Sequence, residues 1–324
     1  MLKTRLCDFL GIDVPIIQAP MGAGTTNAAL AAAVSNAGGL GGFGSLFRTT
    51  DDIKRDIDQI RSLTNRHFAV NHIPPTLDRE AFQYTLAARP PVVSFTLGDP
   101  GDLVREAQEV GARVIVQITT VRQAMEAAER GADVIIAQGS EAGGYSGDVS
   151  TMTLVPQVVD AVSPVPVVAS GGIYDGRGIA AALMLGAVGV NIGTRFLASS
   201  EAPTDESYRQ AIAEAKSEDA VKVDVFNDIK VLPGRGGYGT VLRALRSPFI
   251  DEWSGKREEA ADLGERLWDE IQSRVRAGLR RETLVTAGQT VGGIRGTLSV
   301  AEIMRNLVAE TNAALGTAPG KSRN

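Results

Sequence analysis

Eight short apolar runs, rich in Val and Ile, recur through the first two thirds of the chain at intervals of about 20 to 30 residues. Gly, Pro, Asn or Thr bounds each run, as is typical of buried strands between turns. Because nearly every position in them is apolar, they predict a parallel sheet that is covered on both faces. The runs are PIIQA at 15–19, GGLGGFG at 38–44, FAVN at 68–71, VVSFT at 92–96, RVIVQIT at 113–119, DVIIAQ at 133–138, PVVAS at 166–170 and VGVNIG at 188–193.

Helical patterns separate these runs. Residues 49–64 begin at a threonine cap, and residues 120–132 end on glycine. Eight such units predict an α/β fold, a (β/α)8 TIM barrel, made of residues 1–200 and 283–324 and closed by the last helical segment at 299–315. An open doubly wound sheet is the alternative, but it needs a GxGxxG turn after its first strand, and APMGAG at 19–24 lacks that spacing.

Residues 201–282 break the pattern of strand and helix. Residues 205–219 have the pattern of a polar helix, 234–245 that of a loop, and 252–281 that of a long, charged amphipathic helical stretch. We therefore expect a mostly helical insertion that shapes the substrate pocket. Its Arg235, Tyr238 and Arg243 are candidates for contact with an anionic substrate tail or a pyrophosphate.

Composition limits the partners. The formal net charge is −5 and no basic run occurs, which argues against a nucleic-acid partner. One cysteine excludes an intramolecular disulfide, and two histidines cannot form a three-histidine zinc site, so we expect no metal. No apolar stretch reaches the ~20 residues of a membrane span, and no signal peptide is evident. We expect a cytoplasmic, untargeted protein with a small-molecule substrate; the sequence indicates no oligomeric state.

The residues at the carboxyl end of each run are the candidates for chemistry, because barrel active sites lie there. Gln18, Asn71, Gln117 and Gln138 are neutral amides, which donate and accept hydrogen bonds and suit a heteroaromatic ring such as a flavin. The last two runs are followed by turns that suit a phosphate, because backbone N–H groups and glycines lie together there. These turns contain Ser170, Gly171 and Gly172, and then Gly193 and Thr194. Plain tight turns are the alternative.

The segment SEAGGYSGD at 140–148 has three glycines and is expected to be a flexible turn that lets a ligand approach the backbone. Glu141 is expected to brace this loop, with an acid of the site as the alternative. His72 follows Asn71 and is a candidate base at the mouth, with a hydrogen-bonded rim histidine as the alternative. His67 precedes its strand and is expected on the opposite, stabilising face.

Several motifs together resemble the nitronate monooxygenase family. They are PIIQAPMG, AAAVSNAGGLGGFGS, FAVN, GADVIIAQGSEAGG, VPVVASGGIYDGRGIAAALMLGAVGVNIGTRFLAS and AGQTVGGI, in this order, over 12–203 and again over 286–294. The resemblance implies an FMN-dependent TIM barrel. It places the FMN phosphate on the turns at Gly171 and Gly172 and at Gly193 and Thr194.

The resemblance also implies contacts to the flavin ring. The ring is expected near the turn Ala19, Pro20, Met21 and Gly22. Asn71 and Gln117 are expected to contact the flavin, and the loop with Gly143 and Gly144 passes beside the ring. Gln289, in the late GQ motif, is expected to reach toward it.

One position departs from the family pattern, which has glycine, glycine and histidine in this loop. The histidine acts as the catalytic base or as a donor to substrate, and this chain has Tyr145 instead. A phenol with a pKa of about 10 is a poor base at neutral pH but a good hydrogen-bond donor to a nitro oxygen. We therefore expect oxidation of preformed, anionic nitronates, with Tyr145 and His72 as the catalytic candidates.

Three other functions stay open. The first is an NAD(P)H-dependent flavin reductase of enoyl thioesters, enones or quinones, in which Tyr145 polarises a carbonyl. The second is a flavin-binding barrel without turnover. A phosphate-sugar lyase or isomerase on the same barrel is the third, but it needs acid and base residues at the rim, where they are scarce.

Overall fold

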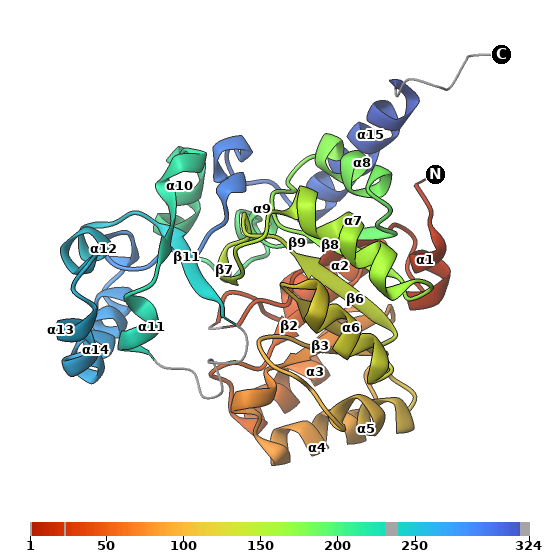
Figure 1. Ribbon diagram of the computed structural model, residues 1–324, viewed down its shortest axis with the longest axis horizontal. Coiled ribbons are helices and arrows are strands. Elements are labelled where there is room, and N and C mark those ends of the chain that lie inside the picture. The colour runs from red at the N-terminus through yellow and green to blue at the C-terminus, as the bar shows by residue number, and fades with distance from the viewer. Residues whose placement is uncertain (1, 23, 231–238, 318–324) are drawn as a thin grey trace.

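The eight apolar runs form the eight parallel strands of a barrel (Figure 1). The computed structural model describes residues 2–22, 24–230 and 239–317. The strands lie in the order β1-β9-β8-β6-β5-β4-β3-β2, and a parallel bridge between Ile17 and Leu40 joins the two ends. This confirms the predicted TIM barrel. The strands are β1 (Ile16–Gln18), β2 (Gly41–Gly44), β3 (Phe68–His72), β4 (Val92–Phe95), β5 (Arg113–Ile118), β6 (Val134–Gln138), β8 (Val167–Ser170) and β9 (Gly189–Ile192).

Alternation along the strands gives the barrel an apolar floor and a polar upper layer. On the inner side, Ala69, Val92, Ile115, Ile136 and Val168 belong to one buried cluster, together with Leu6 and Leu10. Two positions further along the same strands, and so on the same side, are Asn71, Ser94, Gln117, Gln138 and Ser170. The barrel is therefore closed at its N-terminal end and polar at the end where a site is expected.

Helices cover the outside of the barrel (Figure 1). Thr49 caps its helix in a capping box with Asp52, as the sequence predicts. The last helix packs against α8 and α2, so it occupies the position of the eighth barrel helix. The helices are α1 (Arg5–Leu10), α2 (Ala28–Asn36), α3 (Thr50–Leu63), α4 (Arg79–Ala88), α5 (Leu103–Glu109), α6 (Val121–Glu129), α7 (Thr151–Val162), α8 (Gly176–Met184), α9 (Thr194–Leu197) and α15 (Val300–Thr317).

The insertion contains strands as well as helices. Its elements are α10 (Glu206–Glu214), β10 (Ala220–Val223), α11 (Phe226–Ile229), β11 (Val241–Leu245), α12 (Pro248–Trp253), α13 (Arg257–Asp262) and α14 (Gly264–Arg276). The loop predicted at 234–245 is thus wrong for 241–245, where the five residues of β11 form a largely buried strand. Arg235 and Tyr238 lie outside the described residues.

A second, antiparallel sheet joins the insertion to the barrel. It has the order β10-β11-β7, and β7 (Gly144–Ser146) lies in the loop after β6 (Figure 1). The segment predicted as a flexible turn is therefore partly a strand. The physical reason is that this segment pairs with β11, which lies nearly 100 residues further along the chain. Such a long-range pairing cannot be recognised from the local turn residues.

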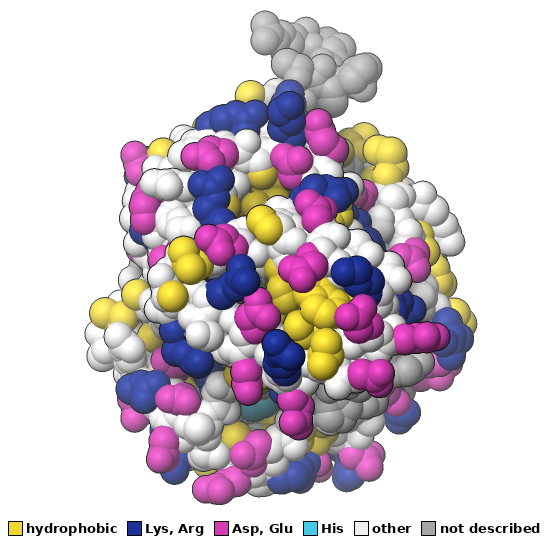
Figure 2. Space-filling view, turned by 90° about the vertical axis from the view of Figure 1, so that its left-hand side faces the viewer, with side chains coloured by type: hydrophobic (Ala, Val, Ile, Leu, Met, Phe, Trp, Pro, Cys, Tyr) yellow, Lys and Arg dark blue, Asp and Glu magenta, His cyan; other side chains and the backbone are white. Residues whose placement is uncertain are grey.

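The surface carries interspersed charges. On the face in Figure 2, which looks onto the insertion, Lys and Arg side chains alternate with Asp and Glu side chains around small apolar areas. None of the described helices is long and apolar enough to cross a membrane. In the same part of the chain, no three His, Cys, Asp or Glu side chains are grouped so that they could hold a metal ion.

Candidate functional site

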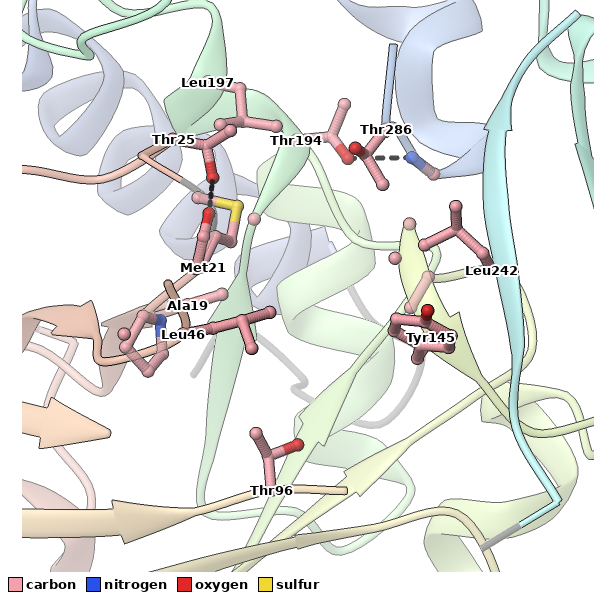
Figure 3. Close-up of a pocket in the computed structure, with 18 of the residues that line it drawn as sticks. Ala19, Met21, Thr25, Leu46, Thr96, Tyr145, Thr194, Leu197, Leu242 and Thr286 are labelled. Carbon is pink, nitrogen blue, oxygen red and sulfur yellow. Dashed lines mark hydrogen bonds between the residues drawn. The ribbon is translucent and has the colours of Figure 1, made fainter. Parts of the chain in front are cut away.

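A cavity of about 750 Å³ lies between the C-terminal ends of the barrel strands and the insertion. This size is in the range of cofactor and substrate pockets. Ala19, Met21 and Leu46 line one side, and Tyr145 and Leu242 lie across from them (Figure 3). The predicted site residues that line it are Ala19, Pro20, Met21, Gly22, Asn71, Gln117, Gly143, Gly144, Tyr145, Ser170, Gly171, Gly172, Gly193 and Thr194.

The turn after β1 is held in one conformation. The Thr25 hydroxyl donates to the carbonyl of Gly22 at 2.7 Å, and the Thr26 hydroxyl donates to that of Met21. A side chain at Gly22 would place its Cβ 2.7 Å from that of Leu46. The turn therefore offers a fixed wall of backbone and apolar atoms to a flat ligand.

Two buried amide oxygens in the cavity wall have no hydrogen-bond partner. They are Oε1 of Gln138 and Oδ1 of Asn191. The amide nitrogen of Asn191 donates to the hydroxyl of Ser170 at 3.1 Å, so its oxygen is the atom left for a ligand. Buried acceptors are nearly always satisfied, so these two fit a ligand that carries N–H or O–H donors, as the ring and the ribityl chain of a flavin do.

Asn71 and Gln117 are two further amides of the cavity wall, and they have protein partners that set their orientation. Gln18, the remaining predicted amide, does not line the cavity. Oδ1 of Asn71 accepts from the hydroxyl of Ser94 at 3.0 Å, which leaves the amide nitrogen to donate. Nε2 of Gln117 donates to the hydroxyl of Thr96 at 3.0 Å, which leaves its oxygen to accept. The wall therefore presents both donors and acceptors.

The turns after β8 and β9 form a glycine-lined corner of the cavity. Gly171 and Gly172 have φ values of +99° and +70°, which favour glycine. A Cβ at Gly171 would lie 3.0 Å from the carbonyl oxygen of Gly139. Thr194 begins α9, and its hydroxyl accepts from the N–H of Gly288 at 3.0 Å (Figure 3). The corner suits an anion such as a phosphate, because backbone N–H groups can approach it closely.

Glu141 braces the loop after β6, as the sequence predicts. Its carboxylate accepts from the N–H of Thr151 at 3.0 Å and from the hydroxyl of the same residue at 2.9 Å. Thr151 is the first residue of α7, where a negative charge is favourable. Although Glu141 lines the cavity, this role leaves it poorly placed to act as a base.

Arg243 does not reach the cavity, so the predicted contact with an anionic ligand is wrong. Its guanidinium donates to the backbone carbonyls of Ser140 and Ala220. Alternation along β11 is the reason, because Leu242 faces the cavity and the next residue points away from it.

His72 also lies away from the cavity, so we do not assign it as a base. The ring packs between β3 and α4, edge-on to Phe82, and Nε2 lies 3.1 Å from the hydroxyl of Thr85. That hydroxyl donates to the carbonyl of Ala81, so Nε2 donates to the hydroxyl. Burial lowers the pKa of His72 to about 4. Strand alternation explains the orientation, because Asn71 faces inward and its neighbour therefore faces outward.

The buried His72 predicts a specific loss of stability in acid. Its pKa is about 4 in the folded protein and 6.5 ordinarily, so the unfolded chain binds the proton first as the pH falls. Between pH 7 and pH 4, His72 should therefore lower the free energy of unfolding by about 3 kcal/mol. Denaturant unfolding at both pH values checks this, because His72→Gln should lose about that much less than the unsubstituted protein. Equal losses in the two proteins would contradict the prediction.

Gln289 contributes its backbone rather than its side chain. Its N–H donates to the carbonyl of Glu141 at 3.0 Å, and the side chain is not among those that line the cavity. The neighbouring Gly288 does line it. The late GQ motif therefore supports the loop after β6, and a direct contact between the Gln289 side chain and a flavin stays a prediction.

The insertion lines one side of the cavity, as the sequence predicts, but sequence reasoning did not identify the residues of this wall. The wall is mostly apolar, and its described residues are Tyr208, Phe226, Lys230, Leu242, Trp268, Ile271, Gln272, Val275 and Arg280. Trp268 meets Phe47 of the barrel at 5.8 Å between ring centroids, and Nζ of Lys230 lies 5.0 Å from the centroid of the Trp268 ring. The amphipathic pattern of α14 was the available signal, but it does not tell which apolar residues face a cavity.

Comparisons with known proteins agree with this geometry. The family model described as "Nitronate monooxygenase" matches residues 3–82 and 78–310. A "Probable nitronate monooxygenase" of Staphylococcus aureus (strain MSSA476) is 34% identical over 321 residues, with 85% of this chain and 86% of the relative covered. FabK from Thermotoga maritima has a similar structure, with a TM-score of 0.88, 33% identity and 98% of both chains covered. The nitroalkane oxidase of Streptomyces ansochromogenes is also similar, with a TM-score of 0.85, 27% identity, and 95% of this chain and 99% of that one covered.

Proposed function

The chain belongs to the nitronate monooxygenase family, and we propose that it is an FMN-dependent oxidoreductase that oxidises anionic alkyl nitronates with O2. One observation carries the choice of substrate. Tyr145 stands in the cavity wall where the family pattern has histidine, and no histidine is among the described residues that line the cavity. A site with a hydrogen-bond donor and no histidine base suits a substrate that has already lost its proton.

The cavity fits FMN. The glycine-lined corner at Gly171, Gly172, Gly193 and Thr194 would hold the phosphate, and Asn71, Gln117, Gln138 and Asn191 would contact the ring and the ribityl chain. A bound FMN would supply the redox chemistry between the nitronate and O2. The protein supplies binding, orientation and electrostatics around that chemistry.

Tyr145 would act on the nitro group. Its hydroxyl would donate a hydrogen bond to a nitro oxygen and so orient the nitronate within the cavity. Lys230 and Arg280 are cations among the described residues that line the insertion side, and they make the cavity favourable for an anion. Apolar side chains such as Leu242 and Trp268 would exclude water from the reacting atoms.

Anaerobic rapid mixing tests the proposal through the colour of the bound flavin. Ethylnitronate should bleach the flavin, and neutral nitroethane should do so at least about 100-fold more slowly, because removing its proton needs a base and no histidine is among the described residues that line the cavity. The two substrates are compared at equal concentration and pH, with the nitronate formed beforehand in alkali. Similar rates for both would contradict the proposal.

NAD(P)H-dependent reduction of enoyl thioesters, enones or quinones is the second candidate. The likeness to the FabK structure supports it, and so does the apolar wall of Phe226, Ile271 and Val275, which suits a longer carbon chain. In this reaction Tyr145 would donate to the substrate carbonyl. NADH and NADPH are further arms of the same mixing experiment. Fast bleaching by either, with none by ethylnitronate, would favour the reductase.

A further inference from the structure

The strand that carries Tyr145 depends on the insertion for its position. β7 is three residues long and lies at the edge of its sheet, where it pairs with β11. Tyr145 pairs with Leu242, and Gly144 pairs with Arg243. So short a strand is not stable alone, so the backbone of Tyr145 takes its conformation from the insertion.

Arg243 makes the main side-chain link across this sheet. The side chain is buried, with 7% of the residue exposed, and Nε and Nη2 donate to the carbonyl of Ser140 at 3.2 and 2.9 Å. Nη1 donates to the carbonyl of Ala220 on β10. One guanidinium therefore ties the start of the Tyr145 loop to the far strand of the sheet, because its planar fork reaches two backbone segments at once.

Lys222 holds the other end of the same loop. Its Nζ donates to the carbonyls of Ser146 and Gly147 at 2.8 and 2.7 Å and contacts the carboxylate of Asp148 at 3.2 Å. Cations from β10 and β11 thus bind carbonyls on both sides of Tyr145. The hydrogen bonds fix the chain before and after the tyrosine, and the side chain between them is left to face the cavity.

The barrel holds the loop from the opposite side. A Cβ at Gly143 would lie 2.5 Å from the backbone nitrogen of Gly288, so the two segments are in direct contact. The N–H of Gln289 donates to the carbonyl of Glu141. The loop is therefore clamped between the barrel and the insertion, and Arg243 is the buried anchor on the insertion side.

We propose that Arg243 is a positioning residue for Tyr145: by binding the carbonyl of Ser140 it sets the direction in which the tyrosine hydroxyl donates. The inference rests on the proposed function in taking Tyr145 as the donor to substrate. Hydrogen bonds weaken steeply as their angle and distance change, so a small shift of the loop lowers turnover without removing any group that touches substrate. Lys222 is expected to act in the same way but less strongly, because it is more exposed.

A double-mutant cycle tests this role. Arg243→Met should lower kcat for ethylnitronate about 10-fold or more in the native protein, and less than twofold in a Tyr145→Phe background, because residues that act through one another are not additive. Arg243→Lys keeps one cationic donor group, so its kcat should lie between those of the native protein and Arg243→Met. Arg246→Met is the matched control, because Arg246 follows the end of β11 with an exposed side chain that pairs with Asp251. Equal losses in both backgrounds would overturn the inference.

Hydrogen exchange separates a failure of this inference from a failure of the proposed function. In Arg243→Met, the amides of peptide 139–148 should exchange at least about 10-fold faster than in Arg246→Met, while the strands of the barrel stay protected. This readout needs no turnover, so it decides the positioning role even if Tyr145→Phe leaves the activity unchanged. Unaltered exchange in 139–148 would overturn the inference. If Arg243→Met does not fold, the kinetic cycle and the hydrogen exchange are both measured with Arg243→Lys.

Discussion

Replacing Tyr145 by phenylalanine should lower kcat for ethylnitronate by about 100-fold, the usual effect of removing one preorganised donor. The ring still fills its place beside Leu242, so the cavity keeps its shape and the flavin stays bound. Oxygen uptake at saturating nitronate gives kcat, and the flavin absorption spectrum shows that the cofactor remains. Tyr84→Phe is the matched control, because Tyr84 is a half-buried tyrosine on α4 away from the cavity.

Tyr145→His tests the reverse change, in which the site gains a base. An imidazole with an ordinary pKa of about 6.5 is a base at neutral pH, so this variant should oxidise neutral nitroethane measurably faster than the native protein. The gain should rise with pH as the imidazole loses its proton. If Tyr145→Phe keeps full activity and Tyr145→His gains none, Tyr145 does not act on the substrate.

Replacing Gly171 by alanine should weaken FMN binding by about 100-fold, or roughly 3 kcal/mol. The change strains a backbone with a φ of +99° and places Cβ 2.9 Å from the Thr151 hydroxyl, which distorts the corner proposed for the phosphate. Fluorescence titration of the apoprotein gives the dissociation constant. The affinity for riboflavin, which has no phosphate, should change much less.

Gly111→Ala is the control for backbone strain. Gly111 has a φ of +89°, no atom lies within 4 Å of its added Cβ, and it is remote from the cavity. Gly111→Ala should lower the free energy of unfolding and leave the FMN affinity unchanged. Equal losses of FMN and riboflavin affinity in Gly171→Ala would show that the corner does not hold the phosphate.

The barrel was predictable from the sequence because its strands are buried on both faces. In a strand such as β6, Val134–Gln138, the apolar run is itself the signal, and the polar residue at its end marks the mouth. β11 gave no such signal: its pairing with β7 joins Leu242 to Tyr145 across nearly 100 residues. Long-range pairing of short strands depends on the tertiary fold rather than on local sequence.

The candidate site likewise contains residues that the sequence predicts and residues that it does not. Residues at the ends of strands, such as Asn71 and Ser170, line the cavity as predicted. His72 was placed wrongly at the mouth, although alternation from the inward Asn71 was enough to turn it outward. Trp268 and Phe226 were missed, because an amphipathic helix buries the same residue types whether it covers a core or a cavity. Only the placement of α14 above the barrel distinguishes the two.

The insertion carries two duties through one apolar core, and this matters for how the protein can be re-engineered or can diverge. The β10–β11 pair supports Tyr145, whereas Trp268, Ile271 and Val275 on α14 border the cavity and also pack in the buried apolar cluster that contains Leu242 of β11. Mutations on α14 that keep this packing can therefore alter substrate range while the reacting geometry persists. A library on that helix should hold Ile271 large and apolar, and a graft of the whole insertion must keep Arg243 and its strand.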